Sequence, residues 1–362
     1  MKMINKFKTL FVLLLCSSQL IAAEWGDGFV IGEPTNVDKG NLVEKKKSFT
    51  YSFGLEKNDA IDIDNHYGDV KFKYWEKAEV RFDVIVVANA NSDNRADAFI
   101  DAVKITASKE SGVASTSSKL DCKKLKYEDN VNSSLNPLDR NYLKVNYTVY
   151  LPKGHKIVVD NANGDIYLPN NTAEIKIKQE HGVLYASNLE NAANEIEVNY
   201  GLAYIKSISG GKLTASKMKV VIDNAKDLLL MNTFGEVKVN SAENVDFHGK
   251  YTSGYVGEMK QSCKFKIDYS NDFTLGEVDK NVKDFELVTS YSDVTFPMCR
   301  KAKFNMTVEA KNCDVEVAHE QVANALNCKK NKNLVKTVEV GTAENEPSNI
   351  FISANNGKVR IK

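Results

Sequence analysis

The first candidates for metal binding or catalysis are the five histidines, His66, His155, His181, His248 and His319. None lies in an HExxH motif, and none is four residues from another histidine, the spacing that a helical zinc site uses. His66 and His181 lie in segments that are typical of turns, where a histidine is an ordinary solvated side chain. The sequence therefore predicts no metal ligand and no catalytic histidine.

Aspartates flank the predicted turns at Asp62, Asp64, Asp69, Asp160 and Asp165. Calcium takes six to eight oxygens in close order, but neither DNHYGD nor DNANGD has the EF-hand spacing. Glycoside cleavage needs two carboxyls that face one substrate, whereas the outward positions here mix Lys, Asp, Glu and Thr. GxSxG, phosphate-loop and dinucleotide fingerprints are missing from the sequence. We therefore predict no catalytic residue and no cofactor.

Aromatic residues at turns are the candidate binding residues. Tyr67, Tyr200 and Phe234 each precede a glycine, and Tyr291 occupies the matching place before Ser292. These four side chains could form part of a stacking platform for sugars. The alternative interpretation is a ladder of cross-strand contacts that only stabilises the fold.

The segments around these turns repeat one phrase about every nineteen residues between 157 and 317: two runs of alternating apolar residues with a turn between them. The phrase is clear in Ile157-Val-Val159, the turn DNANG, and Ile166-Tyr-Leu168. A fixed period of this length is typical of stacked-repeat folds. We call one such pass of the chain a rung.

One rung cannot be stable alone. Burying about four apolar side chains contributes roughly 6–12 kcal/mol, while ordering ten backbone residues costs about 10–20 kcal/mol. Stacking of neighbouring rungs must supply the difference. The constant phase predicts an all-β fold, a parallel β-solenoid of two-strand rungs, although an antiparallel meander of hairpins also fits the local pattern.

The remaining segments complete a predicted division into 1–23, 24–152 and 153–362. Within 24–152 we predict strands at 47–53, 61–63, 70–72, 78–87 and 142–151, one helix at 93–104, and a long polar loop at 109–141. Residues 318–345 are predicted as a loop or short helix. The phrase at 350–361 is predicted to cover the last rung at 304–317.

The first 23 residues have the charged, apolar and small-residue parts of a secretory signal peptide. Cleavage near Ala23 is expected, and lipid attachment at Cys16 is the alternative. Five cysteines remain afterwards, an odd number whose spacing dictates no pairing. Lys+Arg and Asp+Glu are each 48, so the chain lacks the surplus of basic residues that is typical of proteins that bind nucleic acid. We therefore predict no nucleic-acid partner. No segment beyond the leader is apolar enough to span a membrane.

The phrases IDIDNHYGDVKF, NYTVYLP, VNYGLAYI, MNTFGEVKV and VTSYSDVTF resemble a family of exported bacterial "putative adhesin" domains of unknown function. The resemblance covers most of the chain after the leader, and the motifs that carry it are inward aliphatic residues and turn glycines. It implies a β-solenoid-like fold and carries no catalytic residues.

Together these observations predict a non-enzymatic exported module of the periplasm or cell surface that binds or scaffolds, with an envelope glycan or protein as its partner. A polysaccharide-active enzyme on the same scaffold and a purely structural envelope protein are the alternatives. Two carboxylates in one groove would favour the enzyme, and an exposed aromatic surface without such acids would favour binding.

Overall fold

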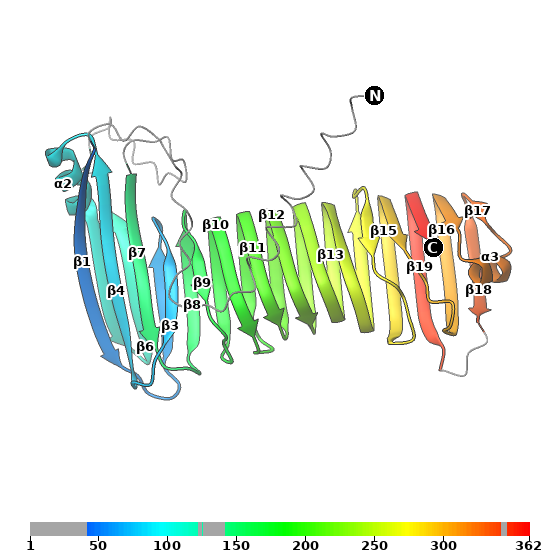
Figure 1. Cartoon of the computed structure of the whole chain (residues 1–362), viewed down its shortest axis with the longest axis horizontal. Coiled ribbons are helices and arrows are strands. Elements are labelled where there is room, and N and C mark those ends of the chain that lie inside the picture. Colours follow the sequence, from blue (N-terminus) through cyan, green and yellow to red (C-terminus); the bar gives the residue numbers. More distant parts are fainter. Residues whose placement is uncertain (1–41, 122–124, 126–141, 342–345) are drawn as a thin grey trace, which may run out of the picture. The chain divides into compact units, whose positions relative to one another are not determined.

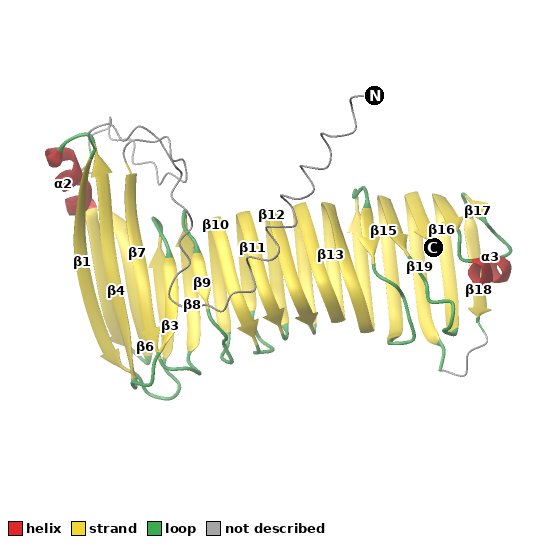
Figure 2. Cartoon of the chain, in the orientation of Figure 1, coloured by secondary structure: helices red, strands yellow, loops and turns green. Residues whose placement is uncertain are grey.

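The computed structural model describes residues 42–121, 125, 142–341 and 346–362. The predicted signal peptide, Cys16, Cys122 and most of the predicted 109–141 loop lie outside these residues. The described part is predominantly β, with two helices and a large, mostly parallel sheet (Figures 1 and 2). In its described residues, no helix is both long and apolar enough to cross a membrane.

The N-terminal part holds the antiparallel pairings β1–β4–β7 and the hairpin β5–β6. Its elements are β1 (Val43–Gly54), β4 (Glu79–Ala90), α2 (Asp93–Ala102), β5 (Val103–Glu110), β6 (Val113–Leu120) and β7 (Tyr142–Leu151). The predicted helix is confirmed over 93–102, where Ala96, Phe99 and Ile100 share its buried face, but 103–104, predicted as its end, begin β5 instead. Burial of these three side chains at 3.6-residue spacing explains why a helix interrupts the β pattern.

The predicted polar loop at 109–141 is wrong for its first part, because β6 lies there. In its sequence VASTSSKL, buried residues alternate with half-buried ones, and the buried residues are the small Ala114, Thr116 and Ser118. β6 pairs in parallel with β2 (Ala60–Asn65) and antiparallel with β5. Because Thr116 and Ser118 carry hydroxyl groups, the sequence shows no apolar alternation here, although both side chains are buried.

The rungs stack by parallel pairing. The first consists of β2 and β3 (Val70–Tyr74), and the second of β8 (Lys156–Ala162) and β9 (Ile166–Leu168). The following strands are β10 (Ile175–Leu189), β11 (Glu195–Ile208), β12 (Gly211–Lys226), β13 (Leu228–Asp268), β14 (Phe273–Leu275) and β15 (Val282–Phe296). The pairings among the described strands β8 to β15 are all parallel, so a meander of antiparallel hairpins is wrong for these strands.

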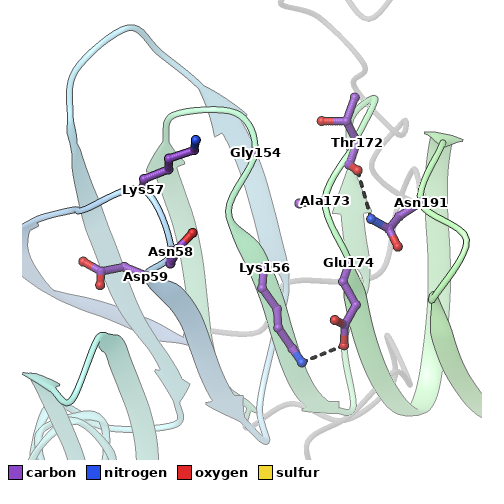
Figure 3. Close-up of a pocket in the computed structure, with 9 residues that line it drawn as sticks. All are labelled: Lys57, Asn58, Asp59, Gly154, Lys156, Thr172, Ala173, Glu174 and Asn191. Carbon is purple, nitrogen blue, oxygen red and sulfur yellow. Dashed lines mark hydrogen bonds and ion pairs between the residues drawn. The ribbon is translucent and has the colours of Figure 1, made fainter.

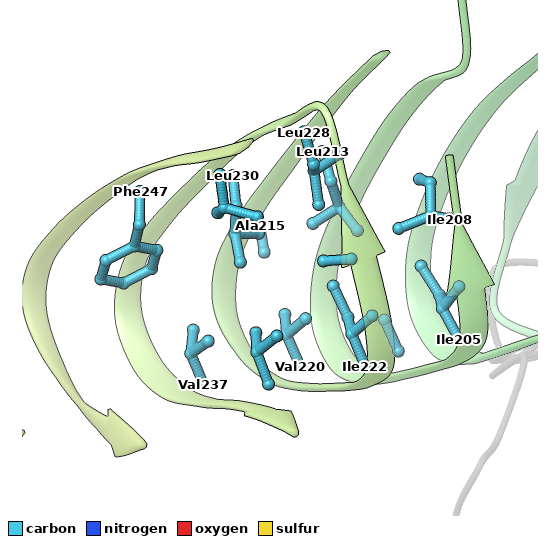
Figure 4. Close-up of a cluster of buried hydrophobic side chains, with 14 of the residues drawn as sticks. Ile205, Ile208, Leu213, Ala215, Val220, Ile222, Leu228, Leu230, Val237 and Phe247 are labelled. Atoms are coloured by element: carbon cyan, nitrogen blue, oxygen red, sulfur yellow. The ribbon is translucent and has the colours of Figure 1, made fainter. Parts of the chain in front are cut away.

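The core lies between the two runs of each rung. Ile196 of β11 is in register with Leu213 of β12, and Leu213 with Leu230 of β13. These residues and the second-run residues Val220 and Val237 are at most 1% exposed. Figure 4 shows such side chains pointing into the space between the runs. Burial therefore follows the alternation that the repeated phrase predicted.

The C-terminal phrase does not cover the last rung as predicted. It forms β19 (Ser348–Ile361), which is inserted between β15 and β16 (Phe304–Val317) and pairs in parallel with both. Leu287, Ile352 and Val308 thus lie side by side across three neighbouring strands. The final segment of the chain is an interior rung, and β16 lies beyond it.

The segment after β16 covers the end that the C-terminal phrase was predicted to cover. It contains α3 (Glu320–Leu326), β17 (Lys330–Asn331) and β18 (Leu334–Val340), and β17 and β18 pair antiparallel with β16. The sequence prediction of a loop or short helix missed β18. Its Leu334 and Val340 are buried together with Val322 and Leu326 of α3, so hairpin and helix close the apolar end of the stack.

Candidate functional site

An exposed row of side chains follows the turn between the two runs of each rung. We call it the aromatic row: His181, Tyr200, Lys217, Phe234, Tyr251, Tyr269 and Tyr291. Each of these residues has a left-handed backbone, with φ between 51° and 56°. Because a left-handed residue turns the chain sharply and points its side chain outward, seven successive rungs from β10 to β15 each contribute one member at the same corner.

The rings of the aromatic row are stacked on one another. Phe234 and Tyr251 have ring centroids 4.8 Å apart and planes inclined by 4°. Tyr251 and Tyr269 follow at 5.2 Å, and Tyr269 and Tyr291 at 5.1 Å. These separations match the spacing of neighbouring strands, about 4.7–4.9 Å, so the backbone itself sets the ring-to-ring distance.

A second, shorter part of the row is centred on Tyr200. The imidazole of His181 stacks on one side of its ring at 4.7 Å. Lys217 lies on the other side, with Nζ 4.8 Å from the ring centroid, and donates a hydrogen bond of 2.8 Å to the Tyr200 hydroxyl. Lys217 therefore separates Tyr200 from the four-ring stack that begins at Phe234.

The stacking decides which part of each ring faces the solvent. Tyr269 is stacked on both sides and still has 46% of its surface exposed. Its accessible atoms are therefore at the ring edge and the hydroxyl, and the ring faces are covered by neighbours. The aromatic edge carries partial positive charge, so the row presents edges and hydroxyl groups rather than flat platforms.

Buried polar side chains behind the corner hold successive turns together. Asn232 donates its side-chain amide to the Thr252 hydroxyl at 3.2 Å. The Ser270 hydroxyl accepts the Thr252 backbone amide at 3.1 Å, and the Ser292 hydroxyl accepts that of Ser270 at 3.0 Å. Each bond joins one rung to the next. The ladder therefore fixes the heights of the turns that carry the stacked rings.

The structure places three of the four predicted binding residues, Tyr200, Phe234 and Tyr291, in the aromatic row. Tyr67 is different: its half-buried ring packs against the core and is tilted by 54° to the ring of His66. Their role in binding stays a prediction.

Sequence reasoning recognised the glycine after Tyr200 and Phe234 and the matching place before Ser292, but it missed Tyr251, which precedes Thr252, and Tyr269, which precedes Ser270. From Tyr200 to Tyr291 the members are 17, 17, 17, 18 and 22 residues apart, and this period alone could have identified them.

A depression near the N-terminal rungs, with a volume of about 420 Å³, is lined mostly by polar residues of β8 and of the loops before β2, before β10 and after β10 (Figure 3). Its acids are paired with lysines: Glu174 with Lys156 at 2.6 Å and Asp59 with Lys109 at 2.6 Å. The hydrogen bond from Lys109 holds the pKa of Asp59 below its usual value. The Asp59 carboxyl is thus not prepared to donate a proton near neutral pH.

Two carboxylates outside the depression have raised pKa values. Burial raises the pKa of Asp62, and the charges of Asp64 and Asp160 add to the shift. Burial also raises the pKa of Asp165, whose carboxylate accepts hydrogen bonds from the backbone of Val183 and the hydroxyl of Tyr167. The bond from Val183 of β10 joins Asp165 to the next rung, whereas the bond from Tyr167 lies within one rung. Among the described residues, no group of three or more His, Cys, Asp or Glu is arranged to hold a metal ion.

The cysteines of the described part form no disulfide: Cys263 and Cys313 are buried, and Cys299 and Cys328 are half-buried. Burial raises the pKa of the Cys263 and Cys313 thiols. A raised pKa lowers the fraction of reactive thiolate. These two side chains therefore act as small apolar residues of the core.

No protein-family model matches the sequence, and a search of curated proteins gives no match. Solved structures described as a putative cell adhesion protein from Clostridium sporogenes and a putative adhesin from Bacteroides fragilis are 13% and 10% identical to this chain. They cover 88% and 87% of it, and 99% and 97% of their own lengths are matched, with TM-scores of 0.20 and 0.30.

A third structure, described as a putative lipid binding protein from Parabacteroides distasonis, is 11% identical. It covers 87% of this chain and is itself matched over 96%, with a TM-score of 0.31. Likenesses at these TM-scores do not assign a function to this chain.

Proposed function

We propose that β8 to β16 and β19 form a β-solenoid that serves as a non-enzymatic, adhesin-like binding or scaffolding module, exported to the periplasm or cell surface. The single observation that carries this proposal is the exposed row of stacked side chains at one corner of successive rungs. Parallel pairing at one rung per repeat supports the solenoid, and the predicted signal peptide supports export.

The chemistry of the aromatic row favours an extended ligand rich in hydroxyl groups, such as an envelope glycan lying along the stack. Tyr251, Tyr269 and Tyr291 offer three hydroxyls at regular spacing. Beside the row, the register-matched residues Ser216 and Thr233 add further hydroxyls. Because the ring faces cover one another, the ligand would be bound by ring edges and hydrogen bonds, not by stacking of sugar rings on aromatic faces.

A binding role is favoured over catalysis by the state of the acids. The carboxylates Asp59 and Glu174 in the depression each form an ion pair with a lysine. The proposal therefore expects purified protein to leave envelope and plant polysaccharides uncut. A rise in reducing ends that one Asp or Glu substitution abolishes would establish the enzyme instead.

The main test uses a glycan array and pull-downs from envelope fractions with the triple variant Y251F/Y269F/Y291F. This variant keeps the stacked rings and removes three hydroxyls. At about 0.5–1.5 kcal/mol for each hydrogen bond, affinity should fall roughly 10- to 2,000-fold. Y167F/Y185F is the matched control, since these two tyrosines also stack, at 5.0 Å, but lie outside the row.

The purely structural role is the second candidate, because the rings of the row cover one another's faces. It predicts that the Phe variant behaves like the parent in every binding assay. It also predicts that Y251S/Y269S/Y291S lowers the melting temperature without changing any interaction. Wild-type protein that captures neither glycan nor envelope protein would overturn the binding proposal.

A further inference from the structure

The insertion of β19 between β15 and β16 defines a slot for one strand. β15 and β16 follow each other in the sequence, yet they do not pair, because β19 lies between them and pairs in parallel with both. Ile350, Ile352, Val359 and Ile361 are at most 2% exposed there. The slot therefore accepts an extended segment with apolar side chains at alternating positions and hydrogen-bonds it along both edges.

Polar contacts fix the direction and register of the inserted strand. Glu316 of β16 pairs with Lys358 at 2.7 Å and with Arg360 at 3.4 Å, both on β19. At the other end, Asn349 of β19 donates its side-chain amide to Asp284 of β15 at 3.0 Å. A strand shifted by one residue would turn its apolar side chains outward and separate these pairs. The slot thus selects the pattern of β19 over a generic apolar strand.

Nothing in these contacts depends on which chain supplies the strand. We propose that the slot between β15 and β16 is a strand-acceptor site whose partner is β19 of a second copy, so that two chains can exchange C-terminal strands. The β19 of a second copy carries the same apolar alternation, the same amide at Asn349 and the same cations at Lys358 and Arg360. Exchange of an identical element adds a partner without any new interface chemistry.

The test uses the full chain and two single cysteine variants, E286C on β15 and F351C on β19. Glu286 and Phe351 are register partners in the parallel pairing, and neighbouring strands lie at a distance that a disulfide can bridge. The two variants are unfolded, mixed, refolded together at several concentrations and oxidised. We expect a 286–351 disulfide between chains, identified by mass spectrometry of the linked peptides, whose yield rises with protein concentration.

Two controls make the result decisive. The double variant E286C/F351C, refolded in dilute solution, should form the same disulfide within one chain. E197C on β11, where the side chain is exposed and remote from the slot in the strand order, replaces E286C in the second control and should give no link to F351C. Strand exchange is refuted by intrachain linking of the double variant without any interchain product at high concentration. Equal linking by E197C, or no linking of the double variant, also refutes it.

Discussion

Replacing Val237 by aspartate tests the inward register of the rungs. Val237 is fully buried between its register partner Val220 and the following rung. Losing the apolar burial of a valine costs roughly 1.5–3 kcal/mol. An unsatisfied buried polar group costs about 1–3 kcal/mol more. Holding the carboxyl protonated at pH 7 adds about 4 kcal/mol, because an ordinary aspartate has a pKa near 3.9 and each unit is worth ~1.4 kcal/mol.

The total is roughly 6–10 kcal/mol, which is comparable with the whole stability of many domains. The sign of its pH dependence follows from burial, which raises the pKa of the new carboxyl in the folded state. The destabilisation of V237D should therefore be largest at neutral pH and should shrink as the pH falls toward 4. Lys238, the next residue, is exposed, so K238D should change stability by at most about 0.5 kcal/mol.

The assay is urea unfolding of wild type, V237D, V237N and K238D at pH 7 and pH 4.5. V237N carries a buried polar group without the ionisable proton, so its penalty should be the same at both pH values. Equal midpoints for V237D and K238D would refute the register. A V237D penalty that does not decrease on acidification would refute the buried-charge argument.

Three further predictions concern single contacts and the chain end. Lys358 and Lys330 lower the pKa of Glu316 to about 2. The contribution of the ionised Glu316 to stability should therefore be present above about pH 4.5 and lost as the pH falls toward 2. Melting curves of E316Q and wild type should differ at pH 7 and converge at pH 2. Deleting 346–362 removes an interior rung, so hydrogen exchange should show lost protection in β15 and β16 but retained protection in β10 to β12; unchanged protection of β16 would contradict the insertion. G201A should lower the melting temperature, because a Cβ at this position of positive φ would lie 2.0 Å from the Gly182 carbonyl oxygen, whereas G54A, with nothing within 4 Å, should melt like wild type.

The alternation of apolar residues predicted the rungs well because each inward position requires an apolar side chain. Ile177, Ile196 and Leu213 are register partners in three successive strands, and each is apolar at the same phase of the phrase. The order of the strands could not be predicted in this way. Ile352 of β19 has the same pattern as Val308 of β16, so no local signal states that β19 precedes β16 in the stack.

The candidate site was predicted only in part for a similar reason. Phe234 was recognised by the glycine after it. Glycine is one kind of residue that follows the left-handed turn residue in this row. After Tyr251 the following residue is a threonine, and the Thr252 hydroxyl points inward and donates a hydrogen bond to the Asn232 carbonyl in the buried polar ladder. That hydroxyl is invisible as a turn signal in the sequence, although the spacing of the row would have revealed it.

The interior position of β19 also has a consequence for the order in which the fold can form. A chain is made from its N-terminus, and β8 to β15 can each dock on the preceding rung as soon as it emerges. β16 must wait, because its parallel neighbour β19 follows it in the sequence and extends to Ile361. We therefore expect growth of the stack to stop at β15 and to resume only when synthesis reaches residue 361, with β19 docking next and β16 after it.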